Sequence, residues 1–436
     1  MNQTELWEVV AQTQKHIAKY YAGALSDDNK QDELKSYIEK YLSDYRLSVP
    51  GYTGRQLVDR IYSEMVEYSI LTPYLGSPLL DEINVNSWDD ITLTYSDGTM
   101  KKLPEHFRDP THAVDIVKRL LHHSNMIIDN AAPIAQGHLP HNTRITALKT
   151  PIVDDTCGIA VSIRLLHPQR ITRRKLIESG MATEEMICFL ETCIRYGISM
   201  VVAGRTSSGK TTLLNALLCS IPNDKRIYSI ESGARELFLV KRNEYGEVLN
   251  NVVHTLSRPS ENSTYNITQE NLVVAALRFD PDLIAVGEIR DEEANAAVEA
   301  SLTGHTVVTT VHSGPAEAAH GRIALLCQRR FQLGMAVSLN QARQAFPIVV
   351  FAHRCEDNNR RIMDITEVAV TPEGESEYRC LYRYRITGNA CEDGQYSVSG
   401  YFEKVNPPSE YLQTLLTRSG VPQSVLQQFT REEEVT

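Results

Sequence analysis

The sequence of 436 residues predicts an α/β protein with a parallel-sheet core, preceded by a small α+β domain and a helical extension. From about residue 180 onward, short apolar runs of strand length alternate with helix-forming runs, which is typical of a parallel α/β sheet. Before that, residues 75–168 mix short alternating strands with one helical segment. Residues 1–70 are polar with spaced apolar residues, a pattern that favours helices.

These patterns divide the chain into four regions. Residues 1–72 form the helical extension, and residues 73–168 form the α+β domain, where Asp97-Gly98 marks a hairpin. Residues 169–180 read as a linker, and residues 181–436 form the parallel α/β domain. Its last part, about 371–436, contains a tyrosine-rich pair of strands and an amphipathic helix, which we interpret as a small appendage.

The composition, 42% hydrophobic and 23% charged, is that of a globular protein, without an apolar run long enough to cross a membrane. The amino-terminal segment lacks the apolar core of a secretory signal. Eight cysteines without C-x-x-C pairs indicate reduced thiols, so we expect a cytoplasmic protein. The net charge of −11 argues against general nucleic-acid binding. The basic run "RITRRK" at 170–175, with four basic residues in six, is compatible with a local basic patch for nucleic acid, but we favour its interpretation as a solvated linker.

The most specific motif is "GRTSSGKTT" at 204–212, which lies between the apolar run "ISMVVA" and the helix-forming run "LLNALL". It fits G-x-x-x-x-G-K-[ST], a loop whose backbone N–H groups turn toward an anion at a helix N-terminus. Lys210 would reach the β- and γ-phosphates, and the Thr211 hydroxyl would bind Mg²⁺. A Gly/Ser loop without function would need neither the lysine nor the flanking elements. We therefore predict a nucleotide site formed by Gly204, Arg205, Thr206, Ser207, Ser208, Gly209, Lys210, Thr211 and Thr212.

A carboxylate follows a second buried strand, because "LIAV" at 283–286 precedes Gly287 and Glu288. Ligands of open α/β sheets bind at the carboxyl ends of the strands. Glu288 is therefore expected to face the phosphates and to deprotonate a water that attacks the γ-phosphate. The residue before such a glutamate is usually Asp. With Gly287 in that position, Mg²⁺ must rely on Thr211, on water and on Glu231, which ends the strand candidate "YSIE". The alternative is that Glu288 is a surface carboxylate.

A histidine ends a third strand, "TVVTTVHS", at position 312. A histidine in that place is often structural. Together with the phosphate loop and Glu288, however, it predicts that His312 hydrogen-bonds the γ-phosphate and responds to its loss. His305 is ambiguous, because it can simply cap the preceding helix.

Taken together, these motifs resemble the hexameric secretion ATPases of type II and type IV secretion and of type IV pili, and look most like the CpaF-like branch, which powers tight-adherence pili. The resemblance covers most of the chain. It rests on the ordered segments "DEINVNS", "LPHNTRITAL…GIAVSIRLL", "IYSIESGAREL", "LVVAALRFDPDLIAVGEIRDEEA", "TGHTVVTTVHS" and "ARQAFPIVVFAHR…RRIMDITEVAV". In that family Gly also precedes the catalytic Glu. Glu231 takes the acidic-box position, and Ser232 stands where Asp is common.

The resemblance implies a RecA-like P-loop ATPase core behind a PAS-like α+β domain, with ATP and Mg²⁺ held between the two. It also implies a cytoplasmic motor at the inner face of the membrane: a homohexamer docked on an integral membrane platform protein of a pilus or secretion system, with no direct nucleic-acid partner. Arginines would complete the catalytic site, and Arg144, Arg164, Arg258 and Arg278 match arginine positions of the family. The residues alone indicate only that these arginines lie near strand ends or a helix end. They leave open which arginine acts and from which subunit.

Three other readings compete with this one. A RecA-like DNA translocase or helicase would share the core, but the net charge of −11 speaks against it. A GTPase is suggested by "NKQD" at 29–32, which lies before the phosphate loop in a helical stretch, where the guanine-reading motif does not belong. A scaffold that binds nucleotide without hydrolysing it would not need Lys210, Thr211, Glu288 and His312 together.

Overall fold

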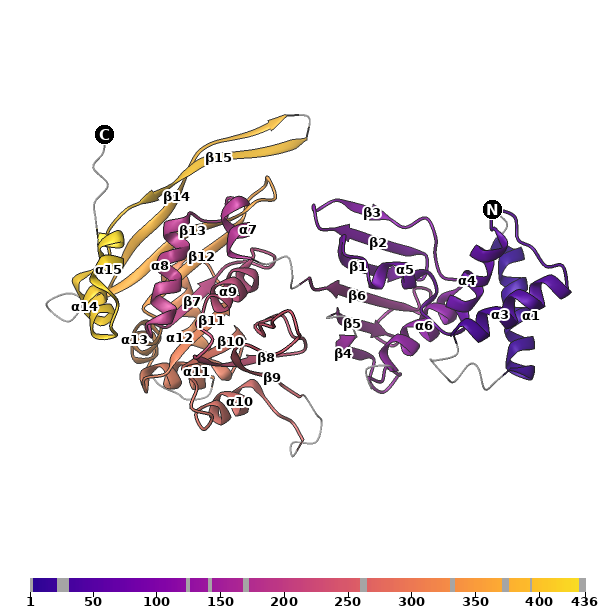
Figure 1. The fold of residues 1–436 in the computed structure, drawn as a ribbon, viewed down its shortest axis with the longest axis horizontal. Coiled ribbons are helices and arrows are strands. Elements are labelled where there is room, and N and C mark those ends of the chain that lie inside the picture. Colours follow the sequence, from indigo (N-terminus) through magenta and orange to yellow (C-terminus); the bar gives the residue numbers. More distant parts are fainter. Residues whose placement is uncertain are drawn as a thin grey trace. The chain divides into compact units, whose positions relative to one another are not determined.

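The computed structural model describes residues 3–21, 31–122, 126–139, 143–167, 172–258, 265–329, 334–370, 376–392 and 394–430. It forms two compact units, Met1–His167 and Pro168–Thr436, which are coloured from indigo to magenta and from magenta to yellow in Figure 1. Each unit contains one β-sheet together with helices, so the predicted α/β class is confirmed. Of the motif "NKQD", Asn29 and Lys30 lie outside the described residues.

The first unit begins with three helices, α1 (Gln3–Tyr20), α3 (Gln31–Asp44) and α4 (Gly54–Met65). Helix α4 starts with a capping box, in which Thr53 and Gln56 each bond the other's backbone N–H. The buried residues Leu34, Ile38 and Ile61 belong to one hydrophobic cluster shared by these helices. Two short turns of helix follow, η2 (Ser69–Leu71) and α5 (Thr72–Leu75).

The rest of this unit is an antiparallel sheet with the order β3-β2-β1-β6-β5-β4. One face of this sheet is apolar, because side chains alternate between the two faces of a strand. In β6, every second residue from Ile159 to Leu165 is buried. Helix α6 contributes Ile116 and Leu120 to the same hydrophobic cluster. The elements are β1 (Leu80–Ser87), β2 (Asp90–Tyr95), β3 (Met100–Lys102), α6 (Pro110–His122), β4 (Ile134–Leu139), β5 (Thr143–Lys149) and β6 (Ile159–Leu165).

A buried carboxylate joins the helices to the sheet domain. Glu64 of α4 lies 2.7 Å from Arg60 and 2.9 Å from His112 of α6, and it accepts a hydrogen bond from Ser69 at 2.6 Å. Arg119, also on α6, donates to the carbonyl oxygen of Glu64 at 3.1 Å. A buried carboxylate is stable only when its oxygens are paired. These contacts therefore hold the helical extension and the sheet domain together in one unit.

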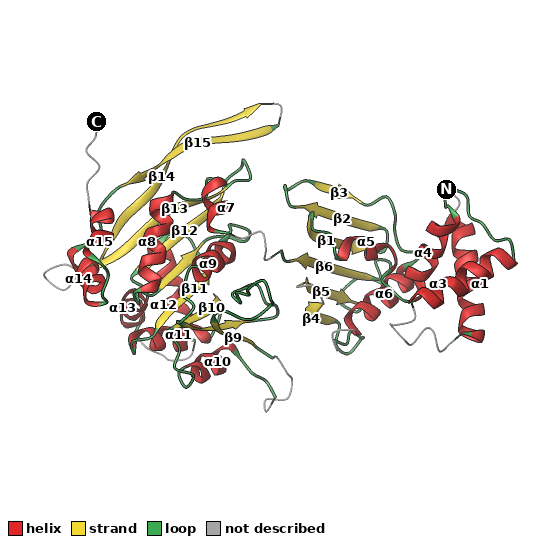
Figure 2. Ribbon diagram, in the orientation of Figure 1, coloured by secondary structure: helices red, strands yellow, loops and turns green. Residues whose placement is uncertain are grey.

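The second unit is built on a nine-stranded sheet with the order β15-β14-β13-β12-β7-β11-β10-β8-β9, whose strands, like those of the first unit, are drawn as yellow arrows in Figure 2. Strands β12, β7, β11, β10, β8 and β9 are parallel to one another, and β13, β14 and β15 add an antiparallel extension. The strands are β7 (Met200–Ala203), β8 (Arg226–Glu231), β9 (Asn251–Leu256), β10 (Leu283–Ile289), β11 (Thr306–Val311), β12 (Ile348–Arg354), β13 (Arg360–Val370), β14 (Ser376–Glu392) and β15 (Gln395–Lys404).

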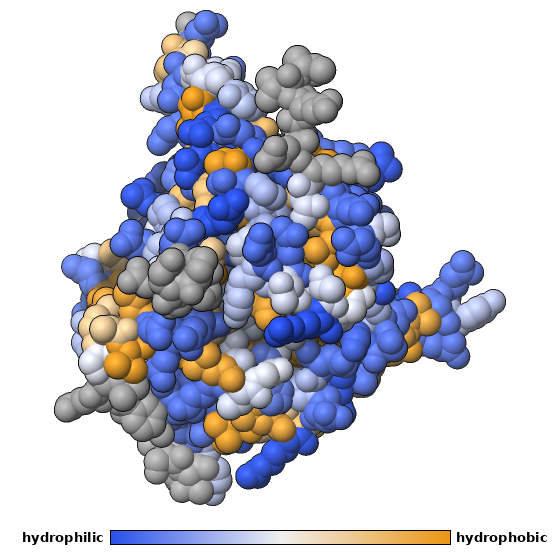
Figure 3. Space-filling model, turned by 90° about the vertical axis from the view of Figure 1, so that its left-hand side faces the viewer, coloured by the Kyte–Doolittle hydropathy of each residue, from blue (hydrophilic) through white to orange (hydrophobic). Residues whose placement is uncertain are grey.

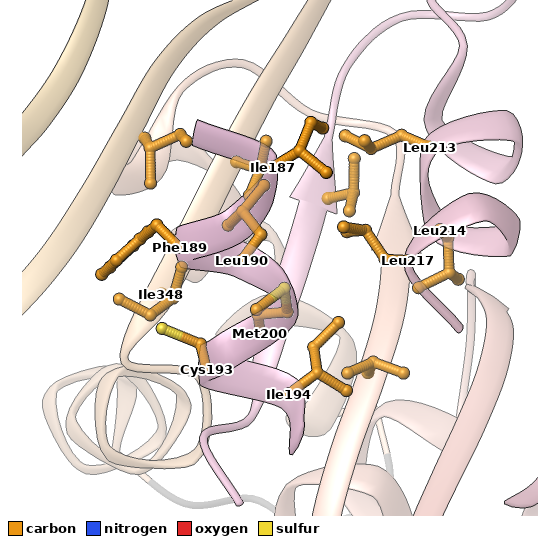
Figure 4. Packing of buried hydrophobic residues seen from close by; sticks show 14 of the residues in the cluster. Ile187, Phe189, Leu190, Cys193, Ile194, Met200, Leu213, Leu214, Leu217 and Ile348 are labelled. Carbon is orange, nitrogen blue, oxygen red and sulfur yellow. The ribbon is translucent and has the colours of Figure 1, made fainter. Parts of the chain in front are cut away.

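Helices cover both faces of the parallel part. Along β7, Met200 and Val202 join one cluster, while Val201 and Ala203 join the other, as the alternation of a doubly buried strand requires. Figure 4 shows α8 and α9 packing on the first face around Met200. The helices are α7 (Arg173–Glu178), α8 (Glu184–Arg195), α9 (Lys210–Cys219), α10 (Gln269–Ala276), α11 (Glu293–Leu302), α12 (Ala316–Cys327), α13 (Met335–Ala345), α14 (Glu410–Arg418) and α15 (Gln423–Thr430).

Strands β14 and β15 form a two-stranded ribbon that extends beyond the other strands of this sheet (Figure 1). Tyr396 and Tyr401 on β15 are more than half exposed. The side of the protein seen in Figure 3 is mostly hydrophilic, with hydrophobic residues in small groups. Within the described residues, no helix is both long and apolar enough to span a bilayer. All eight cysteines are free thiols, of which Cys391 on the ribbon is exposed.

One buried histidine makes the stability of this unit depend on pH. His320 of α12 is fully buried between the carbonyl oxygen of Phe346 and the hydroxyl of Tyr378, and burial lowers its pKa to about 4. The unfolded chain, with an ordinary histidine pKa near 6.5, takes up the proton first, so stability is complete above that pH and is lost as the pH falls toward 4. We expect the free energy of unfolding to fall by about 1–2 kcal/mol from pH 7 to pH 5 through this residue. Urea denaturation of wild type and His320→Gln tests this, and equal pH slopes would contradict it.

Candidate nucleotide site

The phosphate loop leaves the carboxyl end of β7 and enters α9 in a conformation that its sequence makes possible. Ser207 and Gly209 have φ values of 60° and 89°, and Gly209 is the N-cap residue of α9. Glycine adopts the value at position 209 without strain, whereas Ser207 takes up a left-handed conformation that residues with a Cβ adopt only rarely. A Cβ on Gly204 would lie 2.3 Å from the carbonyl oxygen of Ala352 on β12. The loop therefore folds closely against the neighbouring strand β12.

Lys210 lies in this loop as a buried cation. Its Nζ donates to the carbonyl oxygen of Arg205 at 2.9 Å and lies 3.3 Å from Nδ1 of His312. Burial is the main reason that the pKa of Lys210 is below its usual value. An ammonium group has only donors, so Nδ1 of His312 is the acceptor in this contact. The loop thus holds a positive charge where the motif places the β- and γ-phosphates.

His312 and Glu288 lie next to each other because β11, which His312 follows, pairs with β10, which contains Glu288. On its other side β11 pairs with β7, which leads into the phosphate loop. Oε1 of Glu288 lies 3.1 Å from Nε2 of His312, without the alignment of a hydrogen bond. Burial, and secondarily the charge of Lys210, lower the pKa of His312, which keeps the imidazole neutral at pH 7. With Nδ1 accepting from Lys210, the neutral ring carries its hydrogen on Nε2, on the side of the carboxylate.

A break in strand pairing directs Glu288 toward the site. The register between β10 and β11 shifts between Val286 and Ile289, so Gly287 and Glu288 leave the regular ladder. Such irregularities re-aim side chains and are common beside functional sites. The hydroxyl of Thr310 on β11 donates to the carbonyl oxygen of Gly287 at 2.8 Å and helps to fix this bend.

Glu231 ends the neighbouring strand β8 and packs against the same bend. A Cβ on Gly287 would lie 3.2 Å from Cγ of Glu231, which explains why glycine suits a position where Asp is usual. Oε1 of Glu231 accepts from the backbone N–H groups of Glu236 and Leu237 at 2.7 and 2.9 Å. Oε2 is buried without a hydrogen-bond partner, and burial raises the pKa of Glu231 to about 7. Glu231 thus both fixes the following loop and presents one unpaired oxygen.

The four predicted arginines are distributed over both units. Arg144 and Arg164 lie opposite each other on β5 and β6 of the first unit. Arg258 follows β9 at the edge of the second sheet where Glu231 lies, since Ser257 donates its N–H to the carbonyl oxygen of Glu231. Arg278 lies beyond α10, just before the amino end of β10, and therefore at the edge opposite the phosphate loop.

Within the second unit, the structure thus brings together Lys210, His312 and Glu288, with Glu231 on the next strand. It does not bring Arg278 to this group. The physical reason is that α10 carries the chain back along the sheet, from the carboxyl end of β9 to the amino end of β10.

Two arginines that sequence reasoning missed contact the site. Arg290 donates from NH2 to Oε2 of Glu288 at 2.5 Å, and this hydrogen bond raises the pKa of Arg290. Arg360 at the start of β13 donates from Nε to the carbonyl oxygen of Ser207 at 3.0 Å and packs its side chain beside Gly209. Arg290 could have been found from the sequence, because it lies only two positions after Glu288 and residues two apart in a strand face the same side. Nothing in the sequence links Arg360 to a loop 153 positions away.

A pocket of about 1150 Å³ opens beside the loop. It is lined by Arg205, Thr206, residues 312–315, Phe351, His353 and Met363. Its walls combine the first part of the phosphate loop with the ends of β11 and β12, so a molecule bound at the loop has room to extend along the strand ends.

The residues present fit a nucleotide with Mg²⁺. Thr211 is the second residue of α9, beside Lys210, and the buried Ser208 Oγ and Glu231 Oε2 have no hydrogen-bond partner. In the described part of the chain, no group of three or more His, Cys, Asp or Glu side chains is arranged to hold a metal ion. Mg²⁺ in nucleotide sites does not need such a cage, because phosphates and water supply most of its ligands. A hydroxyl at position 211 and one carboxylate oxygen of Glu231 match this requirement.

The close contact between Gly204 and β12 predicts that adding a methyl group at position 204 lowers both stability and nucleotide binding. In Gly204→Ala, the Cβ meets a backbone oxygen that cannot move without breaking the sheet, so we expect a loss of about 1–3 kcal/mol of stability together with weaker nucleotide binding. Chemical denaturation and titration with a fluorescent ATP analogue measure both. The control is Gly321→Ala in α12, where a Cβ has open space and should be neutral or slightly stabilising. Wild-type binding and stability in Gly204→Ala would refute this account of the loop.

Comparisons with known proteins show the family to which the chain is related. The sequence profile of the family described as "Type II/IV secretion system protein" matches residues 64–392. The uncharacterized protein MJ0900 of Methanocaldococcus jannaschii is 31% identical over 250 residues, which are 57% of this chain and 44% of that protein. The type IV secretion system protein PtlH of Bordetella pertussis is 38% identical over 143 residues, 32% of this chain and 40% of that protein.

Among solved structures, the VirB11 ATPase from the Brucella suis type IV secretion system aligns at 24% identity and a TM-score of 0.35, covering 68% of this chain and 94% of that one. The chain spans about half the length of the curated relatives it matches, from 37% to 52% for three proteins of M. jannaschii. Because the family profile covers about three quarters of the chain and includes the phosphate loop, Glu288 and His312, the chain belongs to the type II/IV secretion system protein family.

Proposed function

We propose that this protein is an ATPase motor that converts ATP and water to ADP and phosphate, and that it uses this reaction to drive assembly of a type IV pilus-like fibre or of a secretion or conjugation apparatus. The observation that carries the proposal is the line of contacts Lys210–His312–Glu288 at the carboxyl ends of three paired strands. Membership of the type II/IV secretion system protein family supports the choice of machine. The likeness of the sequence motifs to the CpaF-like branch supports the finer assignment to that branch.

The geometry of the site supports the following roles. The loop and Lys210 bind and neutralise the phosphates, and Thr211 with Glu231 holds Mg²⁺, directly or through water. Glu288 is the general base for the attacking water. His312, placed between the cation and the carboxylate, senses the γ-phosphate by hydrogen bonding. Bound Mg²⁺ supplies positive charge that stabilises the phosphoryl group in the transition state.

We further propose that the motor is a homohexamer, that it lies in the cytoplasm against the inner face of the membrane, and that it docks on an integral platform protein without contacting nucleic acid. Arg144, Arg164, Arg258 and Arg278 are the candidates for extra positive charge at the γ-phosphate. Arg278 lies at the far edge of its own sheet, which leaves a role toward a second copy as the one its position favours.

Two substitutions separate binding from hydrolysis. Lys210→Ala removes the buried cation and should abolish ATP binding, whereas Glu288→Gln keeps the shape but cannot take a proton, so it should bind ATP and lose turnover by about 10²–10⁴-fold. Calorimetric titration with ATP and a steady-state phosphate assay measure the two steps. Turnover retained in Glu288→Gln would move the base to another residue, and undiminished binding by Lys210→Ala would disprove the phosphate site.

The oligomeric state in solution tests the proposed homohexamer. With ATP and Mg²⁺ at high protein concentration, light scattering should give a mass near six times 49.0 kDa. ADP alone should give a different distribution of species if nucleotide contacts bias assembly. A protein that stays monomeric with ATP would contradict the hexamer.

A further inference from the structure

The carboxylate of Glu288 is held on two sides by the same chain. Oε2 accepts a hydrogen bond from NH2 of Arg290 at 2.5 Å, while Oε1 lies 3.1 Å from Nε2 of His312. The glutamate side chain is four-fifths buried, with 19% of its surface exposed. A carboxylate held in this way has one oxygen fixed by an arginine and the other turned toward the phosphate loop.

The backbone that carries Arg290 is fixed independently. Glu293, a buried residue of α11, accepts from the backbone N–H groups of Arg290 and Asp291 at 2.5 and 2.9 Å. The turn between β10 and α11 is therefore rigid at the point from which the arginine side chain extends. The guanidinium itself is about half exposed, so water can solvate the side that does not face Glu288.

We propose that Arg290 is a positioning residue for ATP hydrolysis, which holds Oε2 of Glu288 so that Oε1 faces the attacking water. This inference rests on the proposed ATPase function. Without Arg290, the carboxylate can rotate about its side-chain bonds, and only part of its population presents an oxygen to the site. Misplacing a catalytic group by about 1 Å can cost about 10²-fold in rate. The expected defect is thus in turnover and not in nucleotide binding.

The simpler alternative is an ordinary surface ion pair, which contributes about 0–1 kcal/mol of stability and nothing to the reaction. The chain offers a matched control for it. Arg329 donates to Asp291, the residue after Arg290, at 2.6 Å, and both side chains are at least half exposed. Asp291 lies in the same turn as Arg290, Arg329 follows α12, and the hydrogen bond between them does not involve Glu288.

The experiment compares Arg290→Gln, Arg290→Lys and Arg329→Gln in the full chain with Mg²⁺. We expect kcat of Arg290→Gln to fall by about ten- to hundredfold, with KM and the calorimetric Kd for ATP within about twofold of wild type. Arg290→Lys should recover part of the lost kcat, because an ammonium still reaches the carboxylate but lacks the planar fork. Arg329→Gln should match wild type. If Arg290→Gln keeps wild-type kcat, or if its loss is in KM, the inference is overturned.

A double-mutant cycle tests whether Arg290 acts through Glu288. In the Glu288→Gln background, Arg290→Gln should cause no further loss of the residual turnover. A further loss by the same factor as in the wild-type background means that Arg290 acts on its own and overturns the proposal. A wild-type protein that binds ATP but never hydrolyses it overturns the proposed function together with this inference. An active wild type with an active Arg290→Gln overturns this inference alone.

Discussion

The parallel pairing of β12, β7, β11, β10 and β8 is the constraint on which the site depends. Val311 lies opposite Ala203, Ile289 opposite Val311, and Val286 opposite Ile230, so these strands end at nearly the same level. The residues that follow them therefore meet at one edge, although Lys210 and His312, for example, are 102 positions apart in the sequence. Backbone hydrogen bonds set this arrangement, and the side chains add chemistry to it.

Opposite charges and neutral groups alternate along that edge. The ammonium of Lys210 faces a neutral imidazole, the imidazole faces the carboxylate of Glu288, and the carboxylate faces the guanidinium of Arg290. No two like charges in this line are adjacent, which lowers the cost of keeping ionised groups partly buried. Glu231 departs from the pattern. Glu231 accepts hydrogen bonds from backbone N–H groups through one oxygen, while its other oxygen is buried without a partner. Burial raises the pKa of Glu231, because it disfavours the ionised form of the carboxyl group.

Much of this site could be predicted from the sequence, because its parts lie in short motifs with local structural meaning. The glycines, Lys210 and Thr211 belong to one loop, and Glu288 and His312 follow recognisable buried strands. What could not be predicted depends on contacts between distant segments. Arg360 reaches the loop only through the β12–β13 hairpin, and Arg278 falls at the far edge because of the direction in which α10 runs. The tight space at position 287 comes from the side chain of Glu231 on a neighbouring strand. In the first unit, the strands and helices were predicted from their periodicity, but the buried contacts of Glu64 were not, since polar residues at the ends of helices usually face water.

The buried carboxylate of Glu64 has a thermodynamic consequence for the first unit. Its partners come from α4, from the turn after it and from α6, so separating the helices from the sheet would remove His112 from Glu64 and would take from Arg119 the carbonyl oxygen to which it donates. The free energy needed to break these contacts disfavours states in which only the helices have separated from the sheet. The helices and the sheet are therefore expected to unfold together. A force applied to the amino-terminal helices would accordingly reach the sheet through the contacts of Glu64 and Arg119.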